Sequence, residues 1–284
     1  MTANTAASPG FDVGHDPSVT LKSHAERMVP ESSDRFTFWE HVYRYAFACR
    51  FAAGNRVLDV ACGEGYGAAA LRNAGASHVV GVDISEEVCL HARKKYGLDA
   101  RAGAAESIPL ADSSVELVVS FETIEHVPNP AVFLDECARI LVPGGRLIVS
   151  TPNKDVYSRP GVPKNQYHCS EMTEEEFLSA LRPKFRKIRL YTQHLYSAGW
   201  WSPRIFASEL APRIPGFARV RRSAQFRFFP KAVYDPTDEQ RNSVVEKILG
   251  ASRSRTSPLN PYAVLPRQKW TLERPTYFIA AATR

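Results

Sequence analysis

The feature that most constrains the fold is a glycine-rich loop between an apolar segment and a helix-forming segment. In the run VLDVACGEGYGAAAL, an apolar strand pattern reaches Asp59, and Gly63, Gly65 and Gly67 precede the helical pattern. Glycine lets the backbone turn tightly and approach a ligand closely, while the N-terminus of the following helix presents free N–H groups. The run therefore predicts a strand–turn–helix unit that receives a ligand, although a tight turn without a ligand gives the same pattern.

An acidic residue ends the next predicted strand. The segment HVVGVD closes at Asp83, twenty residues after Gly63, and a carboxylate at that spacing is placed to bind ribose hydroxyls. The loop is GxGxG with Asp59 four residues ahead of its first glycine, which sets it apart from the dinucleotide pattern GxGxxG.

Strand and helix patterns alternate along much of the chain. The segments RVLDVA, HVVGVD, VELVVSF and GGRLIVST have strand character, with helical patterns between them. This alternation with short links predicts an α/β fold with a parallel sheet covered by helices on both faces. An amphipathic helix is expected over residues 35–53, and a capping box of Thr173 and Glu176 opens another. FRKIRLYTQ and PTYFIAAAT predict two more strands.

The same patterns divide the chain. Residues 1–33 are small and polar and are expected to be a mobile N-terminal segment. Residues 34–193 and 273–284 form one predicted domain, and residues 194–272 are an insertion expected to act as a lid or substrate region. The basic and aromatic stretch 213–231 within it fits contact with phosphate, or else a solvated face over an aromatic cluster.

Composition narrows the class of protein. The five cysteines are odd in number and lack CxxC spacing, which indicates reduced thiols in a cytosolic protein. The sequence shows neither a signal-peptide pattern nor an apolar run long enough for a transmembrane helix, so a cytoplasmic location is expected. The net charge of +6 is compatible with an acidic or phosphorylated partner without requiring one.

Charged side chains gather where the fourth predicted strand ends. In VSFETIEHV, the strand pattern ends at Phe121, and Glu122, Glu125 and His126 would share one face of a helical turn. They fit metal ligands, a general base, or capping and solvated charge. NQYHCSE places His168 shortly after the fifth strand, whose end should neighbour that of the fourth.

Taken together, these motifs resemble those of the class I S-adenosylmethionine-dependent methyltransferases. GAAESIPLADSSVELVVSFETIEHV is similar to their adenine-contacting and post-strand motifs, and RILVPGGRLIVSTPN to their fifth strand. The likeness covers roughly residues 35–193 plus the last strand, and is nearest to ubiquinone-pathway and sugar or polysaccharide O-methyltransferases. It implies a Rossmann-like sheet of seven strands, mostly parallel with the last antiparallel, and a lid inserted before the final strand.

The resemblance also implies S-adenosylmethionine as the cofactor. Asp83 would bind the ribose, Phe121 would border the sulfonium, and Arg44 would reach the carboxylate. Many relatives have an acidic residue where this chain has Ala104, so the next two residues are the expected adenine contacts. The implied cofactor-binding residues are Arg44, Asp59, Gly63, Gly65, Asp83, Ile84, Ala105, Glu106 and Phe121.

The order ExxEH, STPN and His-x-x-Glu further resembles the small-RNA 3′-terminal 2′-O-methyltransferases, in which two Glu and two His hold a magnesium ion. ExxEH is likewise a metal site in some ubiquinone-pathway O-methyltransferases. The resemblance implies Glu122, Glu125, His126 and His168 as ligands of Mg²⁺ or another divalent cation. Glu125, His126 and His168 would be the catalytic residues. Two alternatives remain: His126 or His168 as a metal-free base, and a structural role.

The sequence thus predicts methylation of a hydroxyl on a sugar or another small biosynthetic metabolite, possible partners being nucleotide-linked or lipid-linked sugars. Two alternatives differ in kind: N- or C-methylation of a small molecule without a metal, and a binding protein that keeps the cofactor pocket without catalysis. The basic stretch is too short and too interrupted by proline to favour a nucleic-acid substrate.

Overall fold

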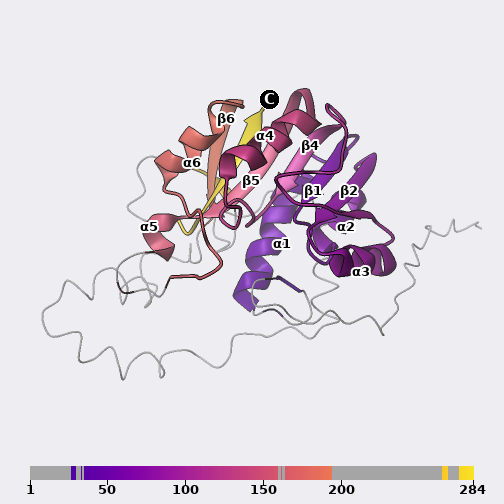
Figure 1. Cartoon of the computed structure of the whole chain (residues 1–284), viewed down its shortest axis with the longest axis horizontal. Helices are drawn as coiled ribbons and strands as arrows, with labels where there is room; N and C mark the ends of the chain where they lie inside the picture. The colour runs from indigo at the N-terminus through magenta and orange to yellow at the C-terminus, as the bar shows by residue number, and fades with distance from the viewer. Residues whose placement is uncertain are drawn as a thin grey trace, which may run out of the picture.

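The structure is a computed structural model that describes residues 27–29, 33, 35–158, 161, 164–193, 264–267 and 275–284. These residues form a single sheet with helices packed against it (Figure 1). Most of the predicted N-terminal segment and of the predicted insertion, including the basic stretch 213–231, lies outside the described residues.

The sheet has the order β3-β2-β1-β4-β5-β8-β6-β7. The first five strands in this order are parallel, and β8 runs antiparallel between β5 and β6. The predicted seven-stranded arrangement with an antiparallel last strand is therefore confirmed, and the short β7 adds an eighth strand at the edge. The strands are β1 Arg56–Val60, β2 His78–Asp83, β3 Asp99–Ala102, β4 Val115–Ser120, β5 Leu141–Pro152, β6 Arg186–Gln193, β7 Val264–Pro266 and β8 Tyr277–Thr283.

Local sequence signals explain where the helices begin and end. The predicted capping box is present at the start of α6, where Thr173 and Glu176 each bond the other's backbone N–H. The helix expected over residues 35–53 ends at Cys49, because residues 50–54 form turns that lead into β1. The helices are α1 Arg35–Cys49, α2 Tyr66–Asn73, α3 Glu86–Tyr96, α4 Pro130–Ile140, α5 Lys154–Tyr157 and α6 Glu174–Leu181.

The sheet separates two hydrophobic cores. Alternate residues of a strand point to opposite faces, so Val57 and Leu117 join the core beneath α1, α2 and α3. Their neighbours Leu58 and Val118 join the core beneath α4 and α6. Both faces of the central strands are buried, which explains their nearly continuous apolar sequences.

The order of the strands positions the candidate site. From β1 the chain adds β2 and β3 on one side and then returns to add β4 on the other. In open α/β sheets, ligands bind at the carboxyl ends of the strands beside such a switch. The loops at this place are the glycine loop after β1 and the charged segment after β4.

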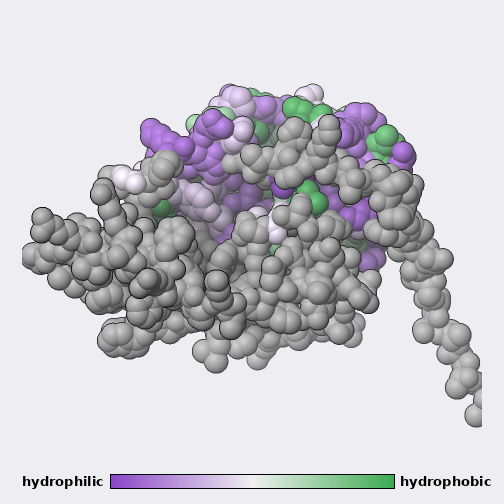
Figure 2. Space-filling model, turned by 90° about the horizontal axis from the view of Figure 1, so that it is seen from below, coloured by the Kyte–Doolittle hydropathy of each residue, from purple (hydrophilic) through white to green (hydrophobic). Residues whose placement is uncertain are grey.

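The described surface is mainly polar. Figure 2 shows hydrophilic residues predominating on the described part of the face seen from below, with hydrophobic ones scattered among them. The exposed large hydrophobic residues of the described chain are Ile84, Leu90, Val132 and Tyr167. Within the described residues, no helix is both long enough and apolar enough to cross a membrane.

Candidate active site

Two glycines turn the loop after β1, and each meets a different requirement. Gly63 and Gly65 have φ angles of 55° and 99°, in the left-handed region that favours glycine. A Cβ on Gly65 would lie 2.8 Å from the Cβ of Ala92, so this glycine allows the loop to pack closely on α3. A Cβ on Gly63 would come no nearer than 4.0 Å to a non-adjacent residue, Arg27. Gly63 therefore has space beside it for a ligand.

The carboxylate of Asp83 lies against this loop. One oxygen accepts a hydrogen bond from the backbone N–H of Gly63 at 3.0 Å, and the other accepts from the N–H of Ser85 at 3.0 Å. Asp83 thus joins the glycine loop to the start of α3, at the position predicted for ribose binding. The next residue, Ile84, is 80% exposed and offers an apolar surface beside it.

Glu64, between the two glycines, is a structural residue that the sequence reasoning missed. Its side chain is buried and accepts hydrogen bonds from Lys95 and Tyr96 and pairs with His91, all on α3. Burial alone would raise the pKa of Glu64, but these partners outweigh burial and lower the pKa. Two features of the sequence could have indicated this structural role. They are a charged residue between two glycines and, later in the chain, the basic run HARKKY.

Asp59 lies beneath the loop rather than at its open side. Its side chain is fully buried, and the hydroxyl of Tyr45 donates to both carboxylate oxygens at 3.1 Å. Burial raises the pKa of Asp59 to about 8, although the Tyr45 hydrogen bond acts in the other direction. The Tyr45 ring also packs edge-on against Phe121, with ring centroids 5.0 Å apart. Asp59 and Tyr45 therefore support the floor of the site.

The segment predicted to contact adenine follows β3. Its first residue, Gly103, donates its backbone N–H to the carbonyl of Asp83 at 2.9 Å, which places the segment beside the residue predicted to bind the ribose. Ala104 and Ser107 bridge across Ala105 and Glu106, which sit at the tip of the turn. The carboxylate of Glu106 accepts from the N–H of Asn129 at 3.3 Å, linking this turn to the segment after β4.

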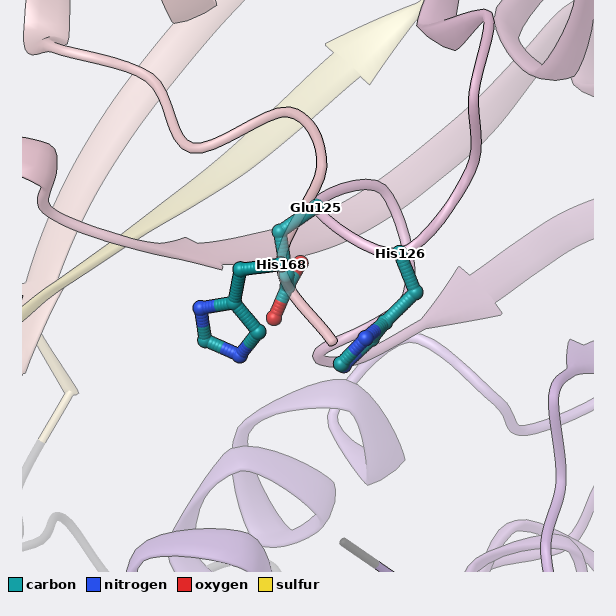
Figure 3. A group of neighbouring side chains, drawn as sticks. All are labelled: Glu125, His126 and His168. Carbon is teal, nitrogen blue, oxygen red and sulfur yellow. The ribbon is translucent and has the colours of Figure 1, made fainter. Parts of the chain in front are cut away.

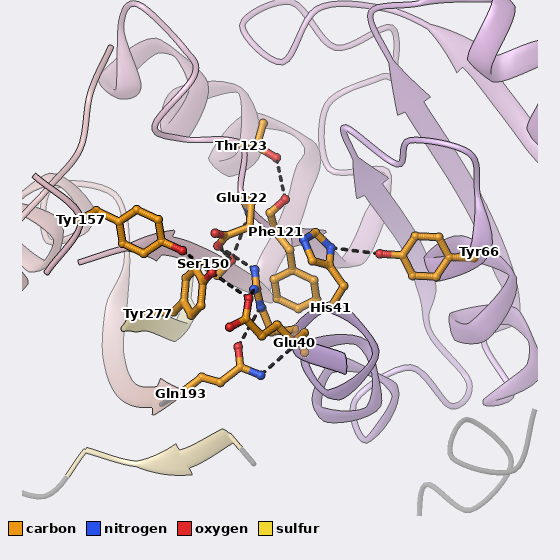
Figure 4. Close-up of polar contacts among 11 residues, drawn as sticks. Glu40, His41, Tyr66, Phe121, Glu122, Thr123, Ser150, Tyr157, Gln193 and Tyr277 are labelled. Carbon is orange, nitrogen blue, oxygen red and sulfur yellow. Dashed lines mark hydrogen bonds and ion pairs between the residues drawn. The ribbon is translucent and has the colours of Figure 1, made fainter. Parts of the chain in front are cut away.

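Glu122 is the first residue after Phe121 and has a strained backbone. Its φ of 51° lies in the left-handed region, which is unusual for a residue other than glycine. The Ser150 hydroxyl contacts both the Glu122 carboxylate and its backbone N–H. A guanidinium nitrogen of Arg44 lies 2.8 Å from the same carboxylate. Figure 4 shows Glu122 and Ser150 on the side of the site that faces Glu40 of α1.

Arg44 is held on all sides by protein groups. Its side chain is fully buried, its Nε donates to the Gln193 amide oxygen at 2.9 Å, and its guanidinium lies 4.2 Å from the centre of the Tyr277 ring. The hydroxyl of Tyr277 donates to Glu40 at 2.8 Å. Burial alone would lower the pKa of Arg44, but Glu122 and the other partners raise it. Arg44 therefore locks α1 onto β4, β6 and β8.

Three of the four predicted metal ligands come together. Glu125, His126 and His168 each offer a ligand atom, and these atoms lie within 4.8 Å of one another. Glu125 is fully buried, His126 is half-buried and the His168 side chain is largely buried, with the two ring centroids 4.8 Å apart. Figure 3 shows the Glu125 carboxylate between the two imidazole rings. One carboxylate and two imidazoles form a set that binds divalent cations or handles a proton.

Backbone contacts hold this cluster in place. The carbonyl of Glu125 accepts from the N–H groups of Cys169 and Ser170, both at 2.9 Å. Nδ1 of His126 lies 3.1 Å from the carbonyl of Tyr167. The segment that carries His168 is thus fastened directly to the segment after β4.

Glu122 lies outside the cluster. The predicted helical turn is a non-helical turn in the structure, and the positive φ of Glu122 separates its side chain from those of Glu125 and His126. Its carboxylate meets Arg44 instead. The metal-ligand role of Glu122 and the carboxylate-binding role of Arg44 stay predictions, as do the other cofactor contacts.

Known proteins with similar sequences share this part of the chain. Residues 58–149, which span most of β1 to β5, match the methyltransferase domain family. A probable S-adenosylmethionine-dependent methyltransferase of Mycolicibacterium smegmatis is 39% identical over 160 residues, which cover 55% of this chain and 62% of that protein. A ubiquinone biosynthesis O-methyltransferase of Xylella fastidiosa is 43% identical over 110 residues, covering 36% of this chain and 44% of that protein. The matches thus span less than two thirds of either relative.

A solved structure supports the fold. The crystal structure of an S-adenosylmethionine-dependent methyltransferase from Thermotoga maritima, described as a possible histamine N-methyltransferase, has a TM-score of 0.51 at 19% sequence identity. The superposition covers 87% of this chain and 94% of that chain. At this level of identity, the likeness concerns the fold alone.

Proposed function

We propose that this chain, which carries a class I S-adenosylmethionine-dependent methyltransferase domain, transfers a methyl group from S-adenosylmethionine to a hydroxyl of a small acceptor. The observation that carries this proposal is the meeting of two features at neighbouring strand ends. Gly63 and Asp83 form a cradle after β1 and β2, and a cluster of proton-accepting side chains follows β4. The first suits the donor and the second suits a hydroxyl acceptor.

The chemistry divides the work between these two features. A bond forms between the acceptor oxygen and the methyl carbon, the bond from sulfur to that carbon breaks, and S-adenosylhomocysteine leaves. The sulfonium donor is already activated, so the protein mainly orients the acceptor and receives its proton. His126 and His168 are the candidate bases, and the carboxyl group of Glu125 lies between them.

The cluster also fits a divalent cation. Glu125, His126 and His168 would hold it, since a carboxylate and two imidazoles within 4.8 Å of one another form a plausible ligand set. A bound cation would lower the pKa of the acceptor hydroxyl and orient it. His126 directs Nδ1 to a backbone carbonyl, which is the usual arrangement of a histidine that binds metal through Nε2.

Sugars and small biosynthetic intermediates are the proposed acceptors, and a diol would suit a cation site. The ubiquinone biosynthesis O-methyltransferase among the relatives supports transfer to oxygen. The alternative, N- or C-methylation without a metal, is distinguished by identifying the methylated atom in the product and by adding a chelator. Chelation would leave that reaction unchanged.

Calorimetric titration tests the central claim. Wild-type protein should bind both S-adenosylmethionine and S-adenosylhomocysteine, and Asp83→Ala should bind each at least about tenfold more weakly, because the ribose contact and the Gly63 hydrogen bond are both lost. Asp112→Ala, which changes an exposed carboxylate, is the control. Absence of binding by wild-type protein would refute the proposed function. Turnover is then followed as S-adenosylhomocysteine formed with a panel of sugar and phenolic acceptors.

A further inference from the structure

We propose that Glu171 is a positioning residue for His168, which it holds in the tautomer whose Nε2 lone pair is available to the Glu125 cluster. The proposal rests on the proposed function only for its kinetic consequence. The assignment itself concerns the chain's own hydrogen bonds.

The contact between the two side chains is short and sheltered. Nδ1 of His168 lies 2.7 Å from Oε1 of Glu171, and the two side chains are only 9% and 8% exposed. A carboxylate accepts hydrogen bonds, so the imidazole nitrogen that faces it carries the proton. In neutral His168 the other nitrogen, Nε2, then bears the lone pair.

A second contact fixes the carboxylate itself. The Ser158 hydroxyl donates to Oε2 of Glu171, the oxygen that does not face His168. Ser158 follows α5, and Glu171 lies two residues before Thr173, the N-cap of α6. The two segments are also joined through their backbones. The N–H of Lys154, the first residue of α5, donates to the carbonyl of Met172, the residue after Glu171, at 3.0 Å. Glu171 is therefore held between the end of α5 and the start of α6.

The second histidine of the cluster, His126, is also held through its Nδ1 atom. Nδ1 of His126 lies 3.1 Å from the carbonyl oxygen of Tyr167, which can only accept a hydrogen bond. In both imidazoles Nδ1 contacts a supporting oxygen, so Nε2 is the nitrogen that would bind a cation or receive a proton. A nitrogen that binds a cation or receives a proton needs this lone pair, and partners on the other ring nitrogen set its direction.

The sequence shows why Glu171 is suited to this task. It lies three residues after His168 in HCSE, in a non-helical segment that precedes α6. The acidic residues that follow belong to the first turn of α6, where negative charge interacts favourably with the helix dipole. They are Glu174, Glu175 and Glu176. Glu171 precedes that turn, and its two carboxylate oxygens contact His168 and Ser158.

Nitrogen NMR of histidine-labelled protein tests the tautomer directly. The ¹⁵N shifts of a neutral imidazole distinguish Nδ1–H from Nε2–H, and the His168 signals are assigned by their loss in His168→Asn. In wild-type protein treated with a chelator, His168 should show the Nδ1–H tautomer. Glu171→Leu should lower the share of Nδ1–H, because it removes the carboxylate that accepts from Nδ1 and leaves no acceptor in its place. Glu175→Gln, at an exposed position on α6, should leave it unchanged.

Kinetics supply the second measurement. Glu171→Leu should lower kcat by about 10–100-fold, the range for losing a supporting partner of a functional histidine, with little change in the Kd for S-adenosylhomocysteine. Glu171→Asp should recover part of the rate. Ser158→Ala should show an intermediate tautomer shift and an intermediate rate, and it tests the proposal if Glu171→Leu does not fold.

The outcomes separate cleanly. An Nε2–H tautomer in wild-type protein, or an unchanged His168 tautomer in folded Glu171→Leu, overturns the proposal. A wild-type protein that binds no S-adenosylmethionine refutes the proposed function, but the tautomer measurement still decides the role of Glu171.

Discussion

A guanidinium nitrogen of Arg44 lies 2.8 Å from a carboxylate oxygen of Glu122, in a region where the Arg44 side chain is fully buried. Arg44 belongs to α1, and Glu122 follows β4 at the centre of the sheet. The pair therefore joins the N-terminal helix to the strand end at which the methyl transfer is proposed to occur. A buried pair of this kind adds little net stability relative to apolar residues, but the loss of one partner is costly.

Arg44→Met should destabilise the fold by about 3–5 kcal/mol, because it leaves Glu122 and Glu40 near each other without their shared cation. Urea unfolding followed by circular dichroism measures this loss. Arg101→Met, which removes an exposed partner of Asp99, is the control and should change stability by less than about 1 kcal/mol. Equal losses of unfolding free energy in the two variants would show that the buried pair contributes no more to stability than the exposed one.

Gly63→Ala should weaken both folding and cofactor binding. An alanine at a φ of 55° costs about 1–2 kcal/mol, and relaxation of the turn would break the hydrogen bond to Asp83. We expect on the order of a tenfold weaker Kd for S-adenosylhomocysteine, equivalent to about 1.4 kcal/mol.

Gly97→Ala is the matched control for Gly63→Ala. Gly97 lies at the C-terminal end of α3 with a φ of 62°, and a Cβ added to it would meet no atom within 4 Å. The variant should lose a similar amount of stability and keep the wild-type Kd. If both variants bind the cofactor normally, Gly63 is a turn residue only.

Asp59 should make stability depend on pH. Its folded-state pKa is raised by burial to about 8, compared with about 3.9 in an unfolded chain. The folded state therefore keeps its proton over a range in which the unfolded state loses it. The contribution of Asp59 is fully present below pH 4 and falls by up to about 1.4 kcal/mol per pH unit as the pH rises toward 8.

Asp59→Asn has no such titration, so it isolates this contribution. Urea midpoints measured from pH 5 to pH 8 should decline more steeply for wild-type protein than for Asp59→Asn. Parallel curves would mean that Asp59 is ionised in the folded state throughout this range.

Much of the fold could be predicted because its signals are local. The glycine loop, the alternating apolar segments and the capping box at Thr173 each act over a few residues. The methyltransferase resemblance drawn from them is confirmed. The meeting of His168 with Glu125 and His126 was also predictable, because parallel strands bring their carboxyl ends to one edge.

The environment of Glu122 could not be read in the same way. Spacing placed it on one face with Glu125 and His126, but that inference required helical backbone angles. The structure has a φ of 51° at Glu122 and a distant partner, Arg44, whose position depends on how α1 docks. Such docking is fixed by the packing of residues far apart in the sequence, as in the contact of Arg44 with Gln193.

The separation of Glu122 from the cluster leads to a prediction about metal binding. If a cation binds through Glu125, His126 and His168, Glu125→Gln should weaken Mn²⁺ binding at least about tenfold, because it removes a charged ligand. Glu122→Gln should leave the Kd for Mn²⁺ near the wild-type value while lowering stability through the loss of the Arg44 pair. Electron paramagnetic resonance of free Mn²⁺ measures the first effect, and urea unfolding measures the second.

Three alternative results would each revise the site in a defined way. Equal weakening of Mn²⁺ binding in the two variants would make Glu122 a fourth ligand, which requires it to exchange Arg44 for the cation. Methylation that is unaffected by EDTA and by Glu125→Gln would refute the metal proposal and leave a histidine as the base. Loss of Mn²⁺ binding only in Glu122→Gln would place the cation beside α1, where Glu40 is a second carboxylate close to Arg44.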